Sequence, residues 1–462
     1  MGPFLYACAL VLLGTLALLN ARYNGTLTGC LPRDSRVNLC LQVYERPQVY
    51  ITQAGRTYLR FTARLLAAGD SAGSILSGSG APRRIGVHEK IQVWLAEADD
   101  SLTRRAADRF PTGQIFYTQA RPREATQDPD YAQYLARQGL FCSVFVYRWS
   151  AGPLRPTLID RVRNLRYSLA ARWESDRPAA DREKALLEGL CLGYKANMDK
   201  DLKEAYSVAG ASHILAVSGL HVGALYATLV WLLGWMGRKR APCVAVCCIW
   251  IYAVMVGLSA SVVRSSLMLT LHAAARATGR HNQSMNAWAA AAFVLLVVKP
   301  SNLYDWGFQL SFAAVGSLLL FFPLLRNLLS VRNGVLRFFW ELFCCSVAVQ
   351  LGTLWLTAGL FGSVSPVGLP ANLLVIPLGT LIIYVFVVFL AGCALAPLTP
   401  WLCDLTAHVM LSLAGWLNRT VLFAASLPGA TLYLPSDGLM QAILLWAAVY
   451  MYMILRLYSS ES

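Results

Sequence analysis

The feature that most constrains this chain is a long apolar region in which acidic residues are almost absent. The chain is 56% hydrophobic and only 14% charged, whereas an average soluble domain carries about 25% charged residues. Before residue 206, acidic and basic side chains are dense and mixed. A soluble region therefore precedes a membrane region. From residue 206 onward the acids are Asp305, Glu341, Asp404, Asp437 and Glu461.

We therefore predict a polytopic α-helical membrane protein with a small N-terminal β domain. The apolar run at residues 4–19 predicts a transmembrane anchor over 1–21. A β domain is expected over 22–152, basic amphipathic or interfacial helices over 153–205, and a multi-helix membrane domain over 206–462.

The soluble region reads mostly as short strands. Residues 37–43, 57–66, 91–96, 114–117 and 141–147 alternate in polarity or are rich in β-branched and aromatic residues. Five such strands suit a small barrel or a sandwich, and spacing alone does not choose between them.

A basic helix follows these strands. Apolar residues recur at helical intervals from Leu158 to Trp173, and arginines lie elsewhere on the helix. Such a helix commonly lies in the membrane interface, although a stripe that guides phosphates is the alternative. The net charge of +15 likewise favours a polyanion or anionic lipid as a neighbour.

Nine spans are expected, and basic loops set their orientation. The apolar segments are 208–236, 241–258, 262–278, 285–298, 303–325, 338–361, 368–395, 401–425 and 439–455. Arginines and lysines gather around 238–240, 276–280 and 326–337, in alternate loops. The positive-inside rule then places these loops and the C-terminus in the cytoplasm and the β domain outside. Residues 262–278 and 285–298 are short for spans and suit broken elements that line a cavity.

The segment 211–223 places polar residues inside an apolar run long enough to cross a bilayer. It carries His213, Ser218, Gly219 and His221. Polar groups at membrane depth usually face a bundle interior or a water-filled path. Three interpretations remain open: a pore-lining element, tight helix packing with the histidines as hydrogen-bond donors, or a Ser218–His221 nucleophile and base at i,i+3.

These residues also carry a resemblance to a known family. The run H-x-L-A-V-S-G-L-H resembles the signature of the ComEC-type competence channels, which are membrane proteins that pass single-stranded DNA into bacteria. The resemblance covers roughly residues 36–395, in the order of the family, and includes the end of its extracytoplasmic OB-like domain. Its further motifs are Gly257 to Arg264, Gly307 to Ser311 and Phe312, Gln350, Ser365-Pro366, Pro370 to Leu373, Pro377, Asp130-Tyr131 and Tyr134 to Gly139.

The resemblance implies an inner-membrane channel for single-stranded DNA during natural transformation. Its partners would be single-stranded DNA, the lipid bilayer and other competence proteins: a DNA receptor, a cytoplasmic ATPase and a separate nuclease. It also selects the OB-like option for the β domain. A small-solute transporter or exporter is the alternative from another class, and the Ser–His hydrolase is a third.

The polar residues of the apolar region are the candidate channel-lining groups. A buried Arg264 would offer a positive charge to a passing phosphate, with Asp305 as its counter-ion. In the soluble region, basic grooves with aromatic platforms are the usual means of holding single strands, although aromatics at strand spacing are more often core. The channel candidates are His213, Ser218, Gly219, His221, Arg264, Asp305, Gln309, Ser311, Gln350 and Asn372; the DNA-binding candidates are Arg60, Arg64, Trp94, Phe116, Arg161, Arg163 and Arg166.

The sequence indicates neither a cofactor nor an enzyme. It contains no nucleotide-binding loop, no H-x-H-x-D-H run and no C-x-x-C pair. The metallo-β-lactamase-like domain that many members of the resembled family carry has no counterpart in these residues. Two of Cys30, Cys40 and Cys142 would be able to pair in an oxidising compartment, and the sequence does not say which.

Overall fold

The structure is a computed structural model. It describes residues 36–51, 57–70, 90–96, 110–124, 135, 140–173, 181–195, 197–215, 217–237, 239–277, 284–395 and 399–433. The expected anchor (1–21) and the last expected span (439–455) lie outside these residues. The chain divides into two compact units between Tyr167 and Ser168, and the domain boundaries given above stay predictions.

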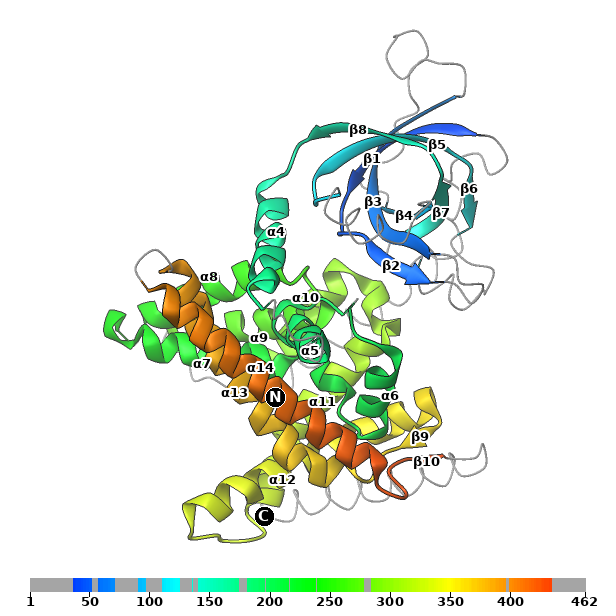
Figure 1. The fold of residues 1–462 in the computed structure, drawn as a ribbon. Helices are drawn as coiled ribbons and strands as arrows, with labels where there is room; N and C mark the ends of the chain where they lie inside the picture. Colours follow the sequence, from blue (N-terminus) through cyan, green and yellow to red (C-terminus); the bar gives the residue numbers. More distant parts are fainter. Residues whose placement is uncertain are drawn as a thin grey trace. The chain divides into compact units, whose positions relative to one another are not determined.

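The N-terminal unit is one curled β-sheet, consistent with an OB-like half-barrel (Figure 1). Its strand order is β6-β7-β4-β3-β1-β5-β8, with β2 paired to β3. The β4–β7 pair is parallel, and the remaining pairs are antiparallel. The strands are β1 (Val37–Val43), β2 (Gln48–Ile51), β3 (Thr57–Asp70), β4 (Lys90–Ala96), β5 (Gln114–Ala120), β6 (Pro122–Glu124), β7 (Leu140–Val146) and β8 (Trp149–Leu154).

The core of this unit follows from the alternation of its strands. Alternate residues of β1 are buried and half-buried along its whole length, as expected when one face of a sheet is covered. Leu39, Leu59, Phe61 and Val93 meet in the core. The five predicted strands are confirmed as β1, β3, β4, β5 and β7; β2, β6 and β8 are short additions.

The second unit is helical. Its helices before the predicted motif are α4 (Leu158–Ala171, which begins in the first unit), α5 (Asp181–Leu192) and α6 (Lys200–Val208). After the motif come α7 (Gly219–Leu232), α8 (Arg240–Met255), α9 (Ala260–Ala277), α10 (Ser284–Val298), α11 (Trp306–Arg326), α12 (Gly334–Phe361), α13 (Gly368–Ala394) and α14 (Pro400–Ser426). Short 3₁₀ turns lie at η2 (Ser212–Ile214), η3 (Gly234–Met236) and η4 (Pro300–Tyr304), and β9 (Ser363–Val364) pairs with β10 (Leu432–Tyr433).

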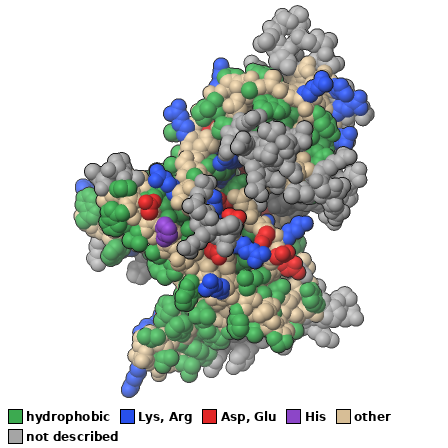
Figure 2. Space-filling view, viewed as in Figure 1, with side chains coloured by type: hydrophobic (Ala, Val, Ile, Leu, Met, Phe, Trp, Pro, Cys, Tyr) green, Lys and Arg blue, Asp and Glu red, His purple; other side chains and the backbone are tan. Residues whose placement is uncertain are grey.

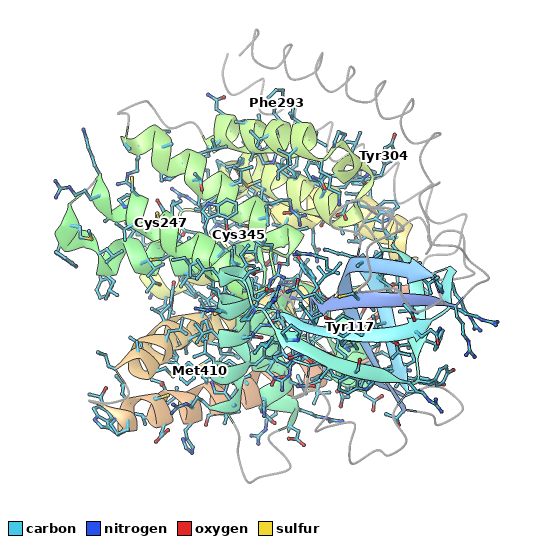
Figure 3. All side chains as sticks on the ribbon, turned by 90° about the horizontal axis from the view of Figure 1, so that it is seen from above. Tyr117, Cys247, Phe293, Tyr304, Cys345 and Met410 are labelled. Atoms are coloured by element: carbon cyan, nitrogen blue, oxygen red, sulfur yellow. The ribbon has the colours of Figure 1, made fainter. Side chains whose placement is uncertain are left out.

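Four of these helices, α11 to α14, are long and apolar enough to cross a membrane; α7, α8 and α10 are apolar but shorter. The helices pair as α11 with α12 and α13 with α14, and α7 packs against α8, α9 and α13. Met410 of α14, labelled in Figure 3, is fully buried. Many hydrophobic side chains lie on the surface in the region of α12 (Figure 2). Phe338 and Leu336 of this helix are exposed. Apolar side chains on the outside of long helices are typical of a lipid-facing surface.

The apolar stripe predicted for the basic helix is exposed along α4 and buried toward its end. Leu158 and Leu165 are exposed, whereas Leu169 and, just past the helix, Trp173 are buried. Two of the arginines of α4 are buried, as described below. The interfacial position of this helix stays a prediction.

Candidate functional site

The expected span 208–236 is broken inside the bundle. α6 ends at Val208, the η2 turn follows, and α7 begins only at Gly219. Gly210 has φ +67° and lies so close to α13 that a Cβ on it would be 3.1 Å from Cα of Gly368. The Ser365 hydroxyl donates to the carbonyl of Val208 at 2.7 Å. Contacts with residues about 160 positions away therefore hold the chain in this non-helical path.

Ser218 and His221 form the N-terminal cap of α7. The Ser218 Oγ accepts the backbone N–H of His221, and the His221 Nδ1 accepts the backbone N–H of Ser218, both at 3.3 Å. Each side chain thus satisfies a helix donor that would otherwise lack a partner. The imidazole Nδ1 is engaged by the backbone and not by the serine hydroxyl, so this geometry does not form the nucleophile–base pair.

The cap lies against the middle of α13. His221 is 2% exposed, and its Nε2 and the side chain of Ile214 would both be 3.7 Å from a Cβ on Gly379. Gly379 is about 17 Å from the start of α13, a helix about 40 Å long at 1.5 Å per residue. In a bilayer crossed by α13, the N-terminus of α7 would therefore lie near mid-depth.

Two neighbouring residues of α9 lie near the N-termini of α7 and α11. A Cβ on Gly219 would be 2.7 Å from the hydroxyl of Ser265. The next residue, Arg264, is 6% exposed, and its guanidinium nitrogens lie about 4 Å from the position of a Cβ on Gly307, at the start of α11. Asp305 caps α11 by accepting the backbone N–H of Phe308 at 2.8 Å.

The N-terminus of α11 and the Arg264 guanidinium bring positive charge close to the Asp305 carboxylate, and the N-terminus of α7 lies against the neighbouring residue of α9. Helix N-termini carry partial positive charge, and Asp305 is the opposing charge that acts on Arg264. The Arg264 Nε is buried with no hydrogen-bond partner. A buried guanidinium that is not fully paired is costly, and such groups within a membrane domain mark candidate sites for anionic ligands.

The other candidate channel residues lie in different environments. His213 is exposed on η2 and close enough to His221 for their charges to interact. The Gln309 amide donates to the carbonyl of Leu303 at 2.8 Å and so serves the η4–α11 junction. Gln350 and Ser311 are half-buried, on α12 and α11.

Asn372 of α13 is 9% exposed, and its Oδ1 is buried without a partner. It stands one turn from Gly368 and two turns from Gly379, on the helix face that contacts the broken segment. The Asn372 Oδ1 and the Arg264 Nε are thus two of the buried polar atoms of this unit that form no hydrogen bond.

Sequence reasoning did not identify several residues of this unit. Ser265 and Gly379 lie outside the motifs that the sequence singled out, and only their contacts mark them. Tyr206 and Asn418 form a buried hydrogen bond of 2.9 Å from the tyrosine hydroxyl to Oδ1, across 212 residues. An amide within an apolar segment was the available signal for Asn418, the same signal that singled out Gln350.

The DNA-binding candidates of the β unit fall into different environments. Phe116 is fully buried in the core, where it contacts Phe61 and Phe110. Trp94 is half-buried on the outer face of β4, and the Arg60 guanidinium lies 5.2 Å from the centre of its ring. Arg64 lies 5.5 Å from the ring of Tyr44.

The arginines of α4 also differ from one another. Arg161 is exposed, whereas Arg163 and Arg166 are buried. Arg163 donates from Nη2 to the hydroxyl of Tyr44 at 2.9 Å and lies over that ring. Arg166 is within hydrogen-bonding distance of Tyr167. Of these three, Arg161 is the one whose side chain is exposed.

The cysteines of the described ranges include one close pair, Cys393 and Cys403, whose sulfur atoms lie 2.8 Å apart. Cys40 carries a free thiol, and burial raises the pKa of this group; Cys30 lies outside these ranges. In the part of the chain with described coordinates, no three His, Cys, Asp or Glu side chains come together as a metal site.

Comparison with known proteins gives one family and several relatives. The model of the family described as "Competence protein" matches residues 190–458. ComE operon protein 3 of Bacillus subtilis (strain 168) is 28% identical over 294 residues, which are 63% of this chain and 36% of that protein. Competence protein ComA of Neisseria gonorrhoeae is 31% identical over 144 residues, 29% of this chain and 21% of that protein.

A third relative, uncharacterized protein YcaI of Escherichia coli (strain K12), is 25% identical over 222 residues, 45% of this chain and 29% of that protein. The alignments thus span between 21% and 36% of the length of these three relatives. No solved structure matches the chain significantly.

Proposed function

Because this chain belongs to the competence protein family, and is a multi-pass membrane protein, we propose that it serves DNA uptake as a channel for single-stranded DNA. Membership of this family supports the role in DNA uptake. The channel part rests on one observation: the broken element between α6 and α7 presents the capped N-terminus of α7 to Ser265 of α9, the residue that follows buried Arg264.

This arrangement suits a polyanion. Single-stranded DNA carries one negative charge per nucleotide, and its path through a membrane has to offset the cost of those charges in a medium of low polarity. Helix N-termini bind phosphate groups through free backbone N–H groups and the helix dipole. Broken helices that aim their N-termini at anionic groups near the midplane are a recurring device of membrane transport.

The cellular setting belongs to the same proposal. The basic loops around Lys239 and between α11 and α12 favour a bacterial inner membrane with these loops in the cytoplasm and the β unit outside. The partners would be single-stranded DNA, the bilayer and the rest of a competence apparatus: a DNA receptor, a cytoplasmic ATPase and a separate nuclease. We expect the chain to act as a conduit and not as an enzyme.

Two alternatives are less well supported. A Ser218–His221 hydrolase needs the imidazole to accept a proton from the serine hydroxyl, but Nδ1 accepts a backbone N–H instead. A small-solute transporter or exporter would be expected to show internal repeats, and no repeat is evident in the sequence.

The test is natural transformation in a deletion strain complemented with single variants. Arg264→Gln removes the buried charge, and we expect transformation to fall by at least about tenfold while the protein remains inserted at normal abundance. The matched control is Arg276→Gln, which removes an exposed arginine from the same helix and should transform normally. Transformation by the deletion strain itself would refute a role in DNA uptake.

A second pair of variants distinguishes the effect of losing the Arg264 charge from the effect of losing the helix cap at Ser218. Ser218→Asn keeps a capping side chain, because Asn is as favourable as Ser at this position, and should retain function. Ser218→Ala removes the cap at a cost of about 0.5–2 kcal/mol. If Arg264→Gln and Ser218→Ala reduce abundance and transformation in parallel, tight packing accounts for the motif and the channel proposal is wrong at this site.

A further inference from the structure

The outer face of the β-sheet carries a row of aromatic and arginine side chains that crosses five strands. It lies on the side of the sheet opposite to the core, because Phe61, Val93 and Val146 point inward from the same strands. Neither the family match, which covers residues 190–458, nor the curated relatives' names assign a role to it. Its members are Arg123 of β6, Phe145 of β7, Trp94 of β4, Arg60 and Tyr58 of β3, and Tyr50 of β2.

The register of the sheet places these residues side by side. Arg60 is the cross-strand partner of Trp94, and Trp94 is the partner of Phe145. The rings of Trp94 and Phe145 are nearly parallel, with an interplanar angle of 16° and centroids 5.9 Å apart. Arg60 lies over Trp94 at 5.2 Å, and Arg123 lies over Phe145 at 5.6 Å. Two arginines therefore flank two stacked rings.

A buried glutamine fixes the position of Arg60. With the Gln92 amide oxygen turned toward β3, Nε and Nη2 of Arg60 donate to it at 2.8 and 2.7 Å. Gln92 is 6% exposed, so the guanidinium is anchored from below while the side chain remains half-exposed. An arginine held in this way loses less entropy when it binds a phosphate.

Tyr50 supplies the exposed ring of the row. Its side chain is 43% exposed, and its ring meets Trp94 edge-to-face at 87° and 5.1 Å. The exposed part of the Tyr50 ring is available for stacking, whereas Trp94 and Phe145 already contact each other.

We propose that this outer row is a binding surface for single-stranded DNA, with a base stacked on Tyr50 and phosphates held by Arg60 and Arg123. This inference rests on the proposed function, since that function supplies the single strand. Proteins that bind single strands without sequence preference combine stacking rings with basic side chains. None of the six side chains in the row is acidic. Bases within a duplex are stacked on both faces, so Tyr50 selects unpaired nucleotides.

Strands lie 4.7–4.9 Å apart, so the row extends over about 19 Å from β6 to β2. OB-type modules hold as few as four nucleotides, a segment of comparable length. Residues Arg60 and Trp94 of the original DNA-binding candidates belong to this surface, whereas Phe116 lies in the core.

The experiment measures binding of a fluorescent oligothymidylate to the full-length chain in lipid nanodiscs, by anisotropy. The test variant is the double substitution Tyr50→Ala with Arg123→Gln, which changes two outward side chains and leaves the core intact. The matched control is Tyr117→Leu with Arg155→Gln, which removes the same two residue types from β5 and the end of β8, at the other end of the sheet. Tyr117 is labelled in Figure 3.

We expect the test variant to bind about tenfold more weakly and its log–log salt slope to shrink by about 0.7 for the lost phosphate contact. The control should bind like the parent chain. Equal binding by both variants would overturn the assignment of this face while leaving the channel proposal intact. Equal affinity of the parent for duplex DNA would overturn the selection of single strands, and no binding by the parent at low salt would overturn both proposals.

Discussion

The contact between α11 and α12 permits a sharp prediction about stability. Gly352 of α12 is buried, and a Cβ at this position would lie 2.9 Å from the backbone oxygen of Ala313 and would also overlap Ser317. Ser317 cannot yield easily, because its hydroxyl donates to the carbonyl of Ala313 at 2.7 Å. Gly352→Ala therefore requires the two helices to separate.

The magnitude follows from overpacking, which costs about 1–3 kcal/mol in a well-packed interior. Gly359→Ala on the same helix is the matched control, because a Cβ there meets no atom within 4 Å. Alanine in place of glycine favours a helix by about 0.5–1 kcal/mol, so the control should be neutral or slightly stabilised. The same helix preference for alanine applies to both variants and cancels, so they should differ by the overpacking cost of about 1–3 kcal/mol.

The assay is the apparent midpoint of thermal unfolding of the detergent-purified protein, measured at one heating rate for all variants. At about 2 °C per kcal/mol for a chain of this size, Gly352→Ala should unfold about 2–6 °C below Gly359→Ala. Equal midpoints would refute the close approach of the two helices at Gly352. A midpoint below that of the parent protein in both variants would show that glycine matters for α12 itself and not for its contact with α11.

Two further predictions concern the membrane unit. Tyr206→Phe leaves the buried Asn418 Oδ1 unpaired and should destabilise the protein by about 1–3 kcal/mol, and combining it with Asn418→Leu should restore part of this loss in the same unfolding assay. Cysteines introduced at Lys239 and Asn333 should be shielded from an impermeant thiol reagent in intact cells, whereas one at Ser74, outside the described residues, should be labelled once the reagent reaches the external face. The reverse labelling would invert the proposed topology.

The sequence by itself determined the class of the protein and much of its β unit. Alternation along residues 37–43 and 57–66 predicts strands with one buried face, because side chains in a strand point to opposite sides in turn. The near absence of acids after residue 206 predicts membrane helices, because lipid cannot hydrate a carboxylate. Both signals are local and need no knowledge of a distant partner.

Other features depend on contacts between residues far apart in the chain. Residues 208–236 are apolar enough to predict one continuous span, yet the helix is interrupted because Gly210 contacts Gly368 and Ser365 bonds to Val208. Composition does not reveal such an interruption, since non-helical backbone at membrane depth is stable only where the surrounding protein satisfies it.

The same distinction holds for individual side chains. Ser218 and His221 were identified from their spacing, but their role as a helix cap follows from where α7 begins. Phe116 and Trp94 are both strand aromatics, and only the packing of the sheet places one in the core and the other outside. Arg264 approaches Asp305 and Gly307 because α9 packs against α11. Sequence determines which groups are polar, and the tertiary structure decides which of them meet, because burial and contact depend on the whole fold.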